Sequence, residues 1–260
     1  IEGELGAVVF DEIHYINDPD RGHVWEECIM MLPNNVQILG LSATMNNPEK
    51  FCSWIEKIKG KPVWLCPNEK RVVPLKHNYF ITVAKSVYEK FPLEIKNLME
   101  TNNFYEKSVL IKDKVFNEMK YEKICKLVKY FRKNNVWVDK KFVLNRMVHH
   151  LKIKDQLPAI CFVFSQKKCE EYANTISIQL FDEGCKVPSI IEDECKKIMM
   201  KLPNYKEYIK LPEYLKITRL LQKGIAYHHA GVTNVFREMI ELLFSKGYIK
   251  LLFATETFSV

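Results

Sequence analysis

The stretch "VVFDEIHYIND", from Val8 to Asp18, decides how the rest of the sequence is interpreted. Three apolar residues lead directly into two neighbouring carboxylates, Asp11 and Glu12. Short apolar runs of this kind are typical of strands buried on both faces of a parallel sheet. Two ionised carboxylates at the end of such a strand would repel each other and resist burial. A polar strand end that faces solvent is one interpretation, and a bound divalent cation is the other.

The geometry of parallel sheets favours the interpretation with a bound cation. Ligands collect at the carboxyl ends of the strands in open parallel sheets. In nucleotide-hydrolysing folds, an aspartate at that position holds Mg²⁺, often through water, and a second carboxylate orients or deprotonates the attacking water. On this interpretation Asp11 and Glu12 serve a nucleotide and a Mg²⁺ ion that is held through water.

The overall composition is that of a globular protein with a basic excess. The 260 residues suffice for one large domain or two of ordinary size, and the net charge of +7 allows a polyanionic partner without requiring one. Eight cysteines are scattered without a C-x-x-C pair, which argues against zinc and favours reduced thiols in an intracellular protein. We expect no membrane segment, because no run approaches about 18 apolar residues, and no signal peptide is visible.

Along the chain, apolar runs alternate with amphipathic stretches, and this alternation predicts parallel α/β sheets. A linker is expected near 70–78, between prolines and a charge cluster. Strands are expected within 6–10, 36–41, 63–65, 159–164, 224–231 and 249–255. Helices are expected within 46–60, where Asn47 can cap and Gly60 can end the helix, and around 124–131, 143–151, 169–176 and 236–247.

A second motif follows the second predicted strand. The tripeptide "SAT" stands at residues 42–44, about thirty residues after "DEIH". Together the two motifs resemble motifs II and III of superfamily 2 helicases of the DExH-box class. The resemblance implies that Asp11 and Glu12 act on Mg·ATP and water, and that His14 contacts motif III to couple hydrolysis to movement. The coupling residues would then be Ser42, Ala43 and Thr44.

Longer stretches narrow the resemblance. The segment "FDEIHYINDPDRGHVWEECIMMLPNNVQILGLSAT" resembles the DExH RNA helicases that serve the RNA exosome, the superkiller and mRNA-transport-defective group. Four further segments resemble the same group: "KRVVPLKH" (70–77), "PAICFVFSQKKCEEYA" (158–173), "LLQKGIAYHHAGV" (220–232) and "GYIKLLFATETFSV" (247–260). The implied fold is α/β with two RecA-like parallel-sheet domains: 1–72 is part of the first, incomplete at its N-terminus, and 73–260 is most of the second, incomplete at its C-terminus.

The resemblance also implies a set of residues that face RNA or the interdomain cleft, and a threonine hydroxyl among them can donate to phosphate. These residues are Ser165, Gln166, His228, His229, Gly231, Thr255 and Thr257. For the two histidines the alternative is an ordinary turn. The Lys-rich stretch 112–154 has two interpretations as well, a solvated helix face or a track for RNA, and we favour the solvated face.

Two elements of the family pattern are missing from the sequence. No G-x-x-x-x-G-K-[ST] motif occurs, and the nearest match, "KGKP" at 59–62, has proline where the hydroxyl is needed. The arginine-finger motif is also absent. We interpret the chain as an internal piece of a longer helicase, and we expect these 260 residues alone not to hydrolyse ATP.

Three functions follow as hypotheses. The first is an ATP-dependent RNA helicase or RNP remodeller that uses ATP and Mg²⁺ to move 3′ to 5′ on single-stranded RNA, with an exosome-type or other RNA-processing complex as a partner. The second is a DNA-repair helicase of the same superfamily. The third is a scaffold that kept the fold and lost the chemistry, although the intact Asp11, Glu12 and Thr44 argue against this.

Overall fold

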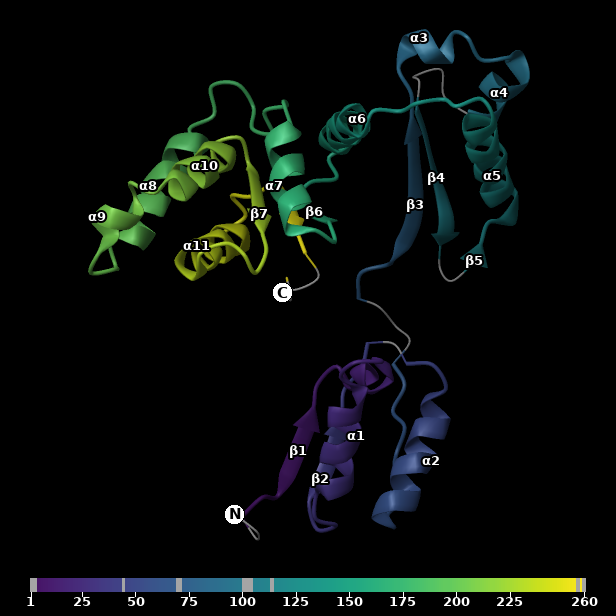
Figure 1. Ribbon diagram of the computed structural model, residues 1–260, viewed down its shortest axis with the longest axis vertical. Coiled ribbons are helices and arrows are strands. Elements are labelled where there is room, and N and C mark those ends of the chain that lie inside the picture. The colour runs from purple at the N-terminus through teal and green to yellow at the C-terminus, as the bar shows by residue number, and fades with distance from the viewer. Residues whose placement is uncertain are drawn as a thin grey trace. The chain divides into compact units, whose positions relative to one another are not determined.

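The computed structural model describes residues 4–43, 45–68, 72–99, 105–112, 115–255 and 258, with the backbone alone for 105–109. The chain divides into two compact units, Ile1–Val73 (unit 1) and Pro74–Val260 (unit 2), which are considered separately (Figure 1). Each unit contains parallel strands and helices that share a hydrophobic core. The predicted α/β class with parallel sheets is therefore confirmed.

Unit 1 is built on one pair of parallel strands. Strand β1 (Ala7–Phe10) pairs with β2 (Gln37–Gly40), and their last residues lie opposite each other. The 3-10 helix η1 (Ile13–Asn17) and helices α1 (Gly22–Met31) and α2 (Pro48–Lys59) complete the unit. Its core consists of Phe10, Ile13, Ile29 and Ile55, with partly buried apolar side chains around them.

The ends of α2 agree with the sequence in part. Gly60 ends the helix in the left-handed conformation at φ 61°, as predicted. Asn47 does occupy the N-cap position, but its side chain makes no capping hydrogen bond. Its own backbone is left-handed at φ 52°, and its carbonyl oxygen accepts from the backbone N–H groups of Lys50 and Phe51 instead.

The strand predicted at 63–65 is wrong. These residues have no regular secondary structure, and Trp64 is 83% exposed. The backbone N–H of Val63 donates to Glu56 Oε1 at 2.9 Å, so a side chain of the preceding helix takes the donor that a strand partner would use. A run of three apolar residues is too short to distinguish these outcomes.

A buried lysine joins the two helices of unit 1. Lys59, the last residue of α2, donates from Nζ to the carbonyl oxygens of Met30 (3.2 Å) and Leu32 (2.6 Å) at the end of α1. Helix C-termini leave carbonyl groups without intrahelical partners, and a cation is favoured there. Loss of water around the Lys59 ammonium lowers its pKa.

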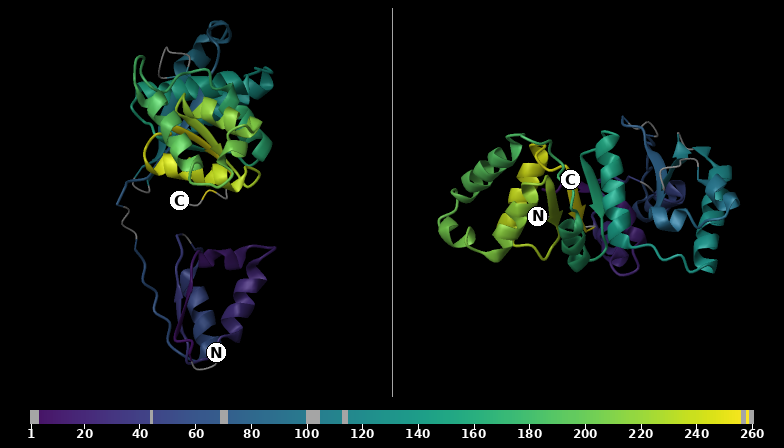
Figure 2. Two further views of the ribbon diagram at one scale, coloured as in Figure 1. Left: turned by 90° about the vertical axis from the view of Figure 1, so that its left-hand side faces the viewer. Right: turned by 90° about the horizontal axis from the view of Figure 1, so that it is seen from above.

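Unit 2 contains a second parallel sheet, in which the strand that comes last in sequence lies in the middle. Its order is β6 (Ala159–Phe162), β8 (Leu251–Ala254), β7 (Ile225–His228), with all strands parallel. Helix α7 (Gln166–Thr175) covers one face, and α10 (Pro212–Leu221) and α11 (Asn234–Ser245) cover the other, as Figures 1 and 2 show. Helices α8 (Val187–Met199) and α9 (Tyr205–Tyr208) complete this part.

The predicted strands and helices of this sheet are confirmed, and their apolar residues form the main core. All four residues of β7 and of β8 are buried. The helical stripe expected after position 235 supplies four fully buried side chains, Phe236, Met239, Ile240 and Leu243.

Residues 74–157 form a part of unit 2 that the sequence analysis describes incompletely; we call it the hairpin module. It contains an antiparallel sheet of order β3 (Lys76–Thr82), β4 (Tyr105–Lys112), β5 (Val115–Phe116). Its helices are α3 (Lys85–Tyr88), α4 (Leu93–Leu98), α5 (Glu118–Lys133) and α6 (Lys140–Ile153). Helices α5 and α6 are the two that were predicted, whereas the hairpin was not, and β3 begins inside the expected linker.

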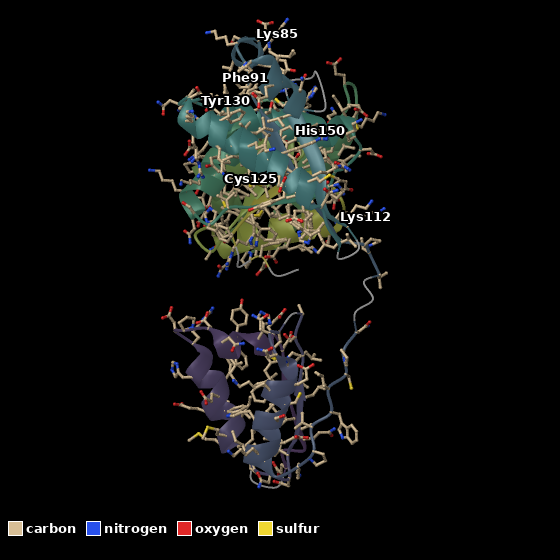
Figure 3. All side chains as sticks on the ribbon, turned by 90° about the vertical axis from the view of Figure 1, so that its right-hand side faces the viewer. Lys85, Phe91, Lys112, Cys125, Tyr130 and His150 are labelled. Carbon is tan, nitrogen blue, oxygen red and sulfur yellow. The ribbon has the colours of Figure 1, made fainter. Side chains whose placement is uncertain are left out.

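The hairpin module has a hydrophobic core of its own. Its buried residues are Val83, Tyr88, Phe91, Ile95, Met99 and Leu127. The ring centroids of Phe91 and Tyr130 lie 5.6 Å apart in an edge-to-face arrangement. Figure 3 labels both residues: Tyr130 belongs to α5, and Phe91 lies between α3 and α4. Helix α5 and helix α6 flank the hairpin on opposite sides (Figures 1 and 2). Within the described residues, no helix has the length and apolar character needed to cross a membrane.

Candidate functional site

The turn after β1 is held against the end of β2 by backbone hydrogen bonds. Leu41 N–H donates to the carbonyl oxygen of Phe10 at 2.8 Å, and Ile13 N–H donates to that of Leu41 at 2.9 Å. These bonds continue the pairing of the two strands beyond Gly40. The acidic turn and Ser42 are thereby brought to the same carboxyl edge of the sheet, as the parallel-strand argument predicts.

Glu12 occupies a strained backbone conformation in this turn. Its φ of 50° and ψ of 43° lie in the left-handed region, which costs a residue with a Cβ about 1–2 kcal/mol. Its N–H donates to Asp11 Oδ1 at 2.9 Å, and its carbonyl oxygen accepts from Tyr15 N–H at 3.0 Å. Such conformations persist only where the surrounding structure holds them in place. They are found mostly at active sites and switch regions. Both carboxylates remain exposed to solvent.

His14 connects the two motifs. Its Nδ1 lies 3.1 Å from Glu12 Oε2 and 3.3 Å from Ser42 Oγ. One ring nitrogen therefore reaches both the acidic turn and the residue that follows β2. Ala43 comes next and is exposed, whereas Thr44 lies outside the described residues.

The donor set at this edge suits a hydrated Mg²⁺ ion. Mg²⁺ is usually bound through one or two carboxylates, several water molecules and substrate phosphates. Asp11 and Glu12 supply two carboxylates that water can reach. Among the described residues, no group of three or more Asp, Glu, His or Cys side chains is arranged to hold a metal ion. These two residues would hold the ion, with the other ligands coming from water and nucleotide.

In unit 2, the turn after β6 and the turn after β7 lie against each other. Ser165 is the N-cap of α7, and its Oγ accepts from Lys168 N–H at 3.5 Å. Gln166 Oε1 lies only 2.6 Å from the position that a Cβ on Gly231 would occupy. The close approach requires glycine or a shift of the glutamine side chain. The structure thus brings together three of the residues predicted to face RNA or the cleft.

The two histidines predicted to contact nucleic acid, His228 and His229, are buried in unit 2. His228 is 4% exposed, and its Nε2 lies 2.7 Å from Glu241 Oε1 on α11. His229 is 2% exposed, and its Nε2 lies 3.4 Å from Glu170 Oε1 on α7. The imidazoles therefore connect β7 to the helices on both faces of the sheet. Their burial gives them a structural role, and a contact of either histidine with RNA stays a prediction.

The tautomer of His229 follows from its neighbours. Its Nδ1 accepts from Gly231 N–H at 3.1 Å, so the neutral ring carries its proton on Nε2, which faces Glu170. Burial lowers the pKa of His229, and the nearby carboxylate of Glu170 opposes this effect. The net effect favours the neutral ring.

Two threonines, Thr255 and Thr257, were predicted to donate hydrogen bonds to RNA phosphates, and the structure describes the first of them. Thr255 directly follows β8 and is buried, and its backbone N–H donates to the carbonyl oxygen of His228 at 3.2 Å. Thr257 lies outside the described residues. The carboxyl edge of this sheet therefore contains Thr255 beside the buried histidines.

The sequence is similar to those of known helicases. A profile of the DEAD/DEAH box helicase family matches residues 3–51. Superkiller complex protein 2 of Homo sapiens is 33% identical over 266 residues, which cover 99% of this chain. Antiviral helicase SKI2 of Saccharomyces cerevisiae is 34% identical over 299 residues, and Exosome RNA helicase MTR4 of Mus musculus is 32% identical over 263 residues, each also covering 99% of the chain. The chain is homologous to the superkiller and MTR4 group of DExH RNA helicases.

The chain is short beside these relatives. It spans 20% of the length of the human superkiller protein and 23% of the length of yeast SKI2 and mouse MTR4. The similarity to the superkiller and MTR4 group nevertheless runs through both units, because the matches extend over nearly all 260 residues. Motif resemblance alone covered about two thirds of the chain and was weakest from 81 to 155.

The sequence analysis missed the residues that support His14. The ring of Tyr15 stacks on His14 with centroids 5.0 Å apart and an interplanar angle of 21°. The Arg21 guanidinium lies 5.1 Å from the Tyr15 ring centroid, and Asp18 Oδ2 lies 3.5 Å from the arginine. Backbone N–H donation from Arg21 holds the pKa of Asp18 below its usual range. Tyr15 and the "RG" at 21–22 lie inside the segment that resembles the superkiller and mRNA-transport-defective group, but the resemblance implied no role for them.

The residue after Arg21 is Gly22, and the nearby backbone of η1 explains why a glycine stands there. A Cβ at this position would lie 2.2 Å from the carbonyl oxygen of Ile16 and 2.9 Å from its carbonyl carbon. The start of α1 therefore passes directly over the backbone of η1. A side chain at position 22 would force the segment that carries Tyr15 and Arg21 to move outward.

Proposed function

We propose that this chain is part of the motor of an ATP-dependent RNA helicase, in which unit 1 acts on the nucleotide and unit 2 contacts single-stranded RNA. The observation that carries the proposal is the shared contact of His14 Nδ1 with Glu12 and Ser42. The names of the relatives support it: "ATP-dependent RNA helicase mtr4" of Schizosaccharomyces pombe is 31% identical over 260 residues.

The chemistry assigned to unit 1 depends on where its carboxylates point. Glu12 is exposed at the carboxyl edge of the sheet, where a carboxylate can orient a water molecule and accept its proton. Asp11 lies beside it, and its Oδ1 is fixed by the N–H of Glu12. When Mg²⁺ is bound with ATP, the ion supplies positive charge against the phosphates.

Coupling is assigned to His14. Because one nitrogen faces both Glu12 and Ser42, a change in the charge or position of the Glu12 carboxylate alters the bond that His14 makes with Ser42. The state of the nucleotide site is passed in this way to the segment after β2. The stacked Tyr15 ring limits the positions that His14 can take.

The RNA side of the proposal rests on the resemblance and on the relatives. We infer 3′ to 5′ movement on single-stranded RNA, with Ser165, Gln166 and Gly231 at the sheet edge of unit 2 as candidate contacts. A role in RNA processing or decay inside the cell, with an exosome-type complex as partner, is proposed because one relative is an exosome RNA helicase. Phosphate contacts of this kind would weaken as salt rises.

The decisive experiment uses the full-length parent protein with Glu12→Gln. We expect ATP hydrolysis to fall about 100-fold or more, because the general base is lost, while nucleotide binding persists. Glu26→Gln, an exposed change on α1, is the matched control and should leave hydrolysis unchanged. Near-normal hydrolysis by Glu12→Gln would show that Glu12 is not the base.

The same assay separates the alternatives. Stimulation of hydrolysis by single-stranded RNA, and not by single-stranded DNA, supports the RNA helicase. Stimulation by DNA alone would favour a DNA-repair helicase. A parent that binds and hydrolyses no ATP under any of these conditions would be a scaffold, and the proposal would be wrong.

A further inference from the structure

The positive charge of the chain is concentrated in the hairpin module. Residues 74–157 contain 18 Lys and Arg against 9 Asp and Glu, whereas the rest of the chain contains 21 against 23. The net charge of +7 thus arises entirely in this segment, which apart from residues 74–77 lies outside the stretches that resemble the helicase group. A basic excess confined to one part of a fold is typical of a surface that meets a polyanion.

Within this module, the exposed cations gather on one side of α5. Four exposed side chains in its C-terminal half have no ion-pair or hydrogen-bond partner among the described residues: Lys126, Lys129, Arg132 and Lys133. At about 100° per residue, these positions fall within about one third of the helix circumference. The surface they form is therefore continuous along the helix.

A cavity lies directly beside this surface. Its volume is about 480 Å³, and it is lined by Val128, Phe131, Arg132, Asn135, Val136 and Trp137. Trp137 is 80% exposed, although tryptophan is one of the residues that proteins bury most on average. Arg132 belongs to both features, since it lines the cavity and is part of the basic surface. An apolar slot, an exposed indole and free cations are thus adjacent.

We infer that this surface is a binding site for single-stranded RNA, separate from the contacts of the helicase motifs. Proteins bind single strands by stacking bases on aromatic side chains beside a positively charged groove. Trp137 supplies the stacking face, Arg132 lies next to it in the cavity, and Lys129 and Lys133 continue the charge along α5. The choice of RNA over another polyanion rests on the proposed helicase function.

A solvated helix end explains only part of this arrangement. Cations near a helix C-terminus are favoured by the helix dipole, and this accounts for Arg132 and Lys133. The dipole does not account for an exposed Trp137 beside a cavity. An acidic protein segment would meet the charges, but it has no planar base to stack on the indole.

The site lies apart from the parallel sheet that contains the motifs of unit 2. Helix α5 packs on β4, and α6 lies on the other side of the hairpin, beside α7 (Figures 1 and 2). In Figure 3, α5 faces the viewer with many side chains projecting outward. An RNA segment bound here would be held in addition to the strand in the motor.

The test measures binding of a fluorescent single-stranded RNA, a 12-nucleotide oligouridylate, to the 260-residue chain by anisotropy. Trp137→Ala should weaken binding about ten-fold, and Trp137→Phe should keep most of it, because base stacking on one aromatic ring is worth about 1–3 kcal/mol. The matched control is Trp64→Ala, since Trp64 is equally exposed (83%) but lies in unit 1, and it should change nothing.

The charges are tested by a double reversal, Lys129→Glu with Arg132→Glu. We expect binding to weaken and the slope of log K against log salt to become shallower by about 1.4, because two phosphate contacts are lost at about 0.7 each. Lys216→Glu with Arg219→Glu places the same change, at the same spacing, on the exposed side of α10 as a control. Circular dichroism confirms that each variant is folded.

Three outcomes would overturn the inference. The first is RNA affinity that is unchanged in the Trp137→Ala and Lys129→Glu/Arg132→Glu variants. The second is an equal loss in the α10 control, which would mean that only net charge matters. The third is binding of a polyglutamate peptide, and not of RNA, at these residues. All three leave the RNA-stimulated ATPase of the parent untouched, so the failure of this inference is distinct from failure of the proposed helicase function.

Discussion

At the scale of single residues, the acidic turn shows how much depends on close contacts that a sequence does not display. The residue types at Asp11, Glu12, His14 and Ser42 were predicted to act together, and the structure does bring the last three into contact. The left-handed backbone of Glu12 was not predictable, because glutamate rarely adopts it and only the surrounding hydrogen bonds hold it there. Tyr15, Asp18 and Arg21 were missed for a related reason, since their contacts depend on the path of the chain.

Gly22 offers a direct test of that path. Gly22→Ala should lower the free energy of unfolding of unit 1 by about 1–3 kcal/mol, because the added Cβ would lie 2.2 Å from the carbonyl oxygen of Ile16. The loss should appear although alanine favours helices over glycine. Gly6→Ala is the control, since nothing lies within 4 Å of a Cβ there. Urea unfolding measures both variants, and equal stability of the two would contradict the close approach.

The buried imidazole of His229 predicts a dependence of stability on pH. Its pKa in the folded chain lies below the ordinary value of 6.5, because burial disfavours the charged ring. The unfolded chain therefore takes up the proton first, so the stabilising contribution is complete above about pH 6.5 and is lost as the pH falls through the folded pKa. Calorimetric melting of unit 2 between pH 7.5 and 5 measures this decline.

The control for this prediction is a histidine in the same unit. His229→Gln should lower the melting temperature at every pH but make the acid-side decline shallower. His149→Gln, at an exposed position on α6, should leave the decline as it is in the native chain. An unchanged decline in His229→Gln would mean that another group causes it.

At the scale of elements, buried strands were the easiest to predict and exposed ones the hardest. Strands β7 and β8 are buried along their whole length, and their continuous apolar runs revealed them. Strand β3 begins "KHN", which is polar and exposed, so its first half looked like a linker. Helix α1 was missed because its apolar residues, in "GHVWEECIMM", do not form one clear stripe.

The link between α2 and α1 predicts a measurable loss of stability. Lys59→Met keeps most of the apolar stem but leaves the carbonyl groups of Met30 and Leu32 without their donor. We expect the free energy of unfolding of unit 1 to fall by about 1–3 kcal/mol, since hydrogen bonds to charged groups are among the stronger ones. Lys57→Met, on the exposed side of the same helix, should stay within about 0.5 kcal/mol. Denaturant titration of both variants would decide.

At the scale of the whole molecule, the fold class and the helicase group could be predicted from the sequence, whereas the hairpin module could not. The α/β class and the helicase group could be predicted because the motifs occur in order along the chain. The hairpin module could not, because its strands pair antiparallel and its core is separate from the main one. His228 and His229 were predicted to contact nucleic acid from the family resemblance alone, and only the packing of α7 and α11 shows that they are buried.

The missing phosphate motif predicts the behaviour of the chain by itself. We expect the 260 residues to hydrolyse no ATP above background, with or without RNA, because no G-x-x-x-x-G-K-[ST] loop is present to hold the phosphates. A coupled phosphate-release assay measures this. Turnover that RNA increases would contradict the prediction and would require another phosphate-binding segment within the chain.

The position of β8 in the middle of its sheet sets the order in which unit 2 can be completed during synthesis. As the nascent chain leaves the ribosome, β3 and β4 are available to pair early, because they are close together in sequence. Strands β6 and β7 have no ladder between them until β8 emerges, since each pairs only with that strand. The hairpin module therefore precedes the parallel sheet, which forms only after residues 251–254 have been translated.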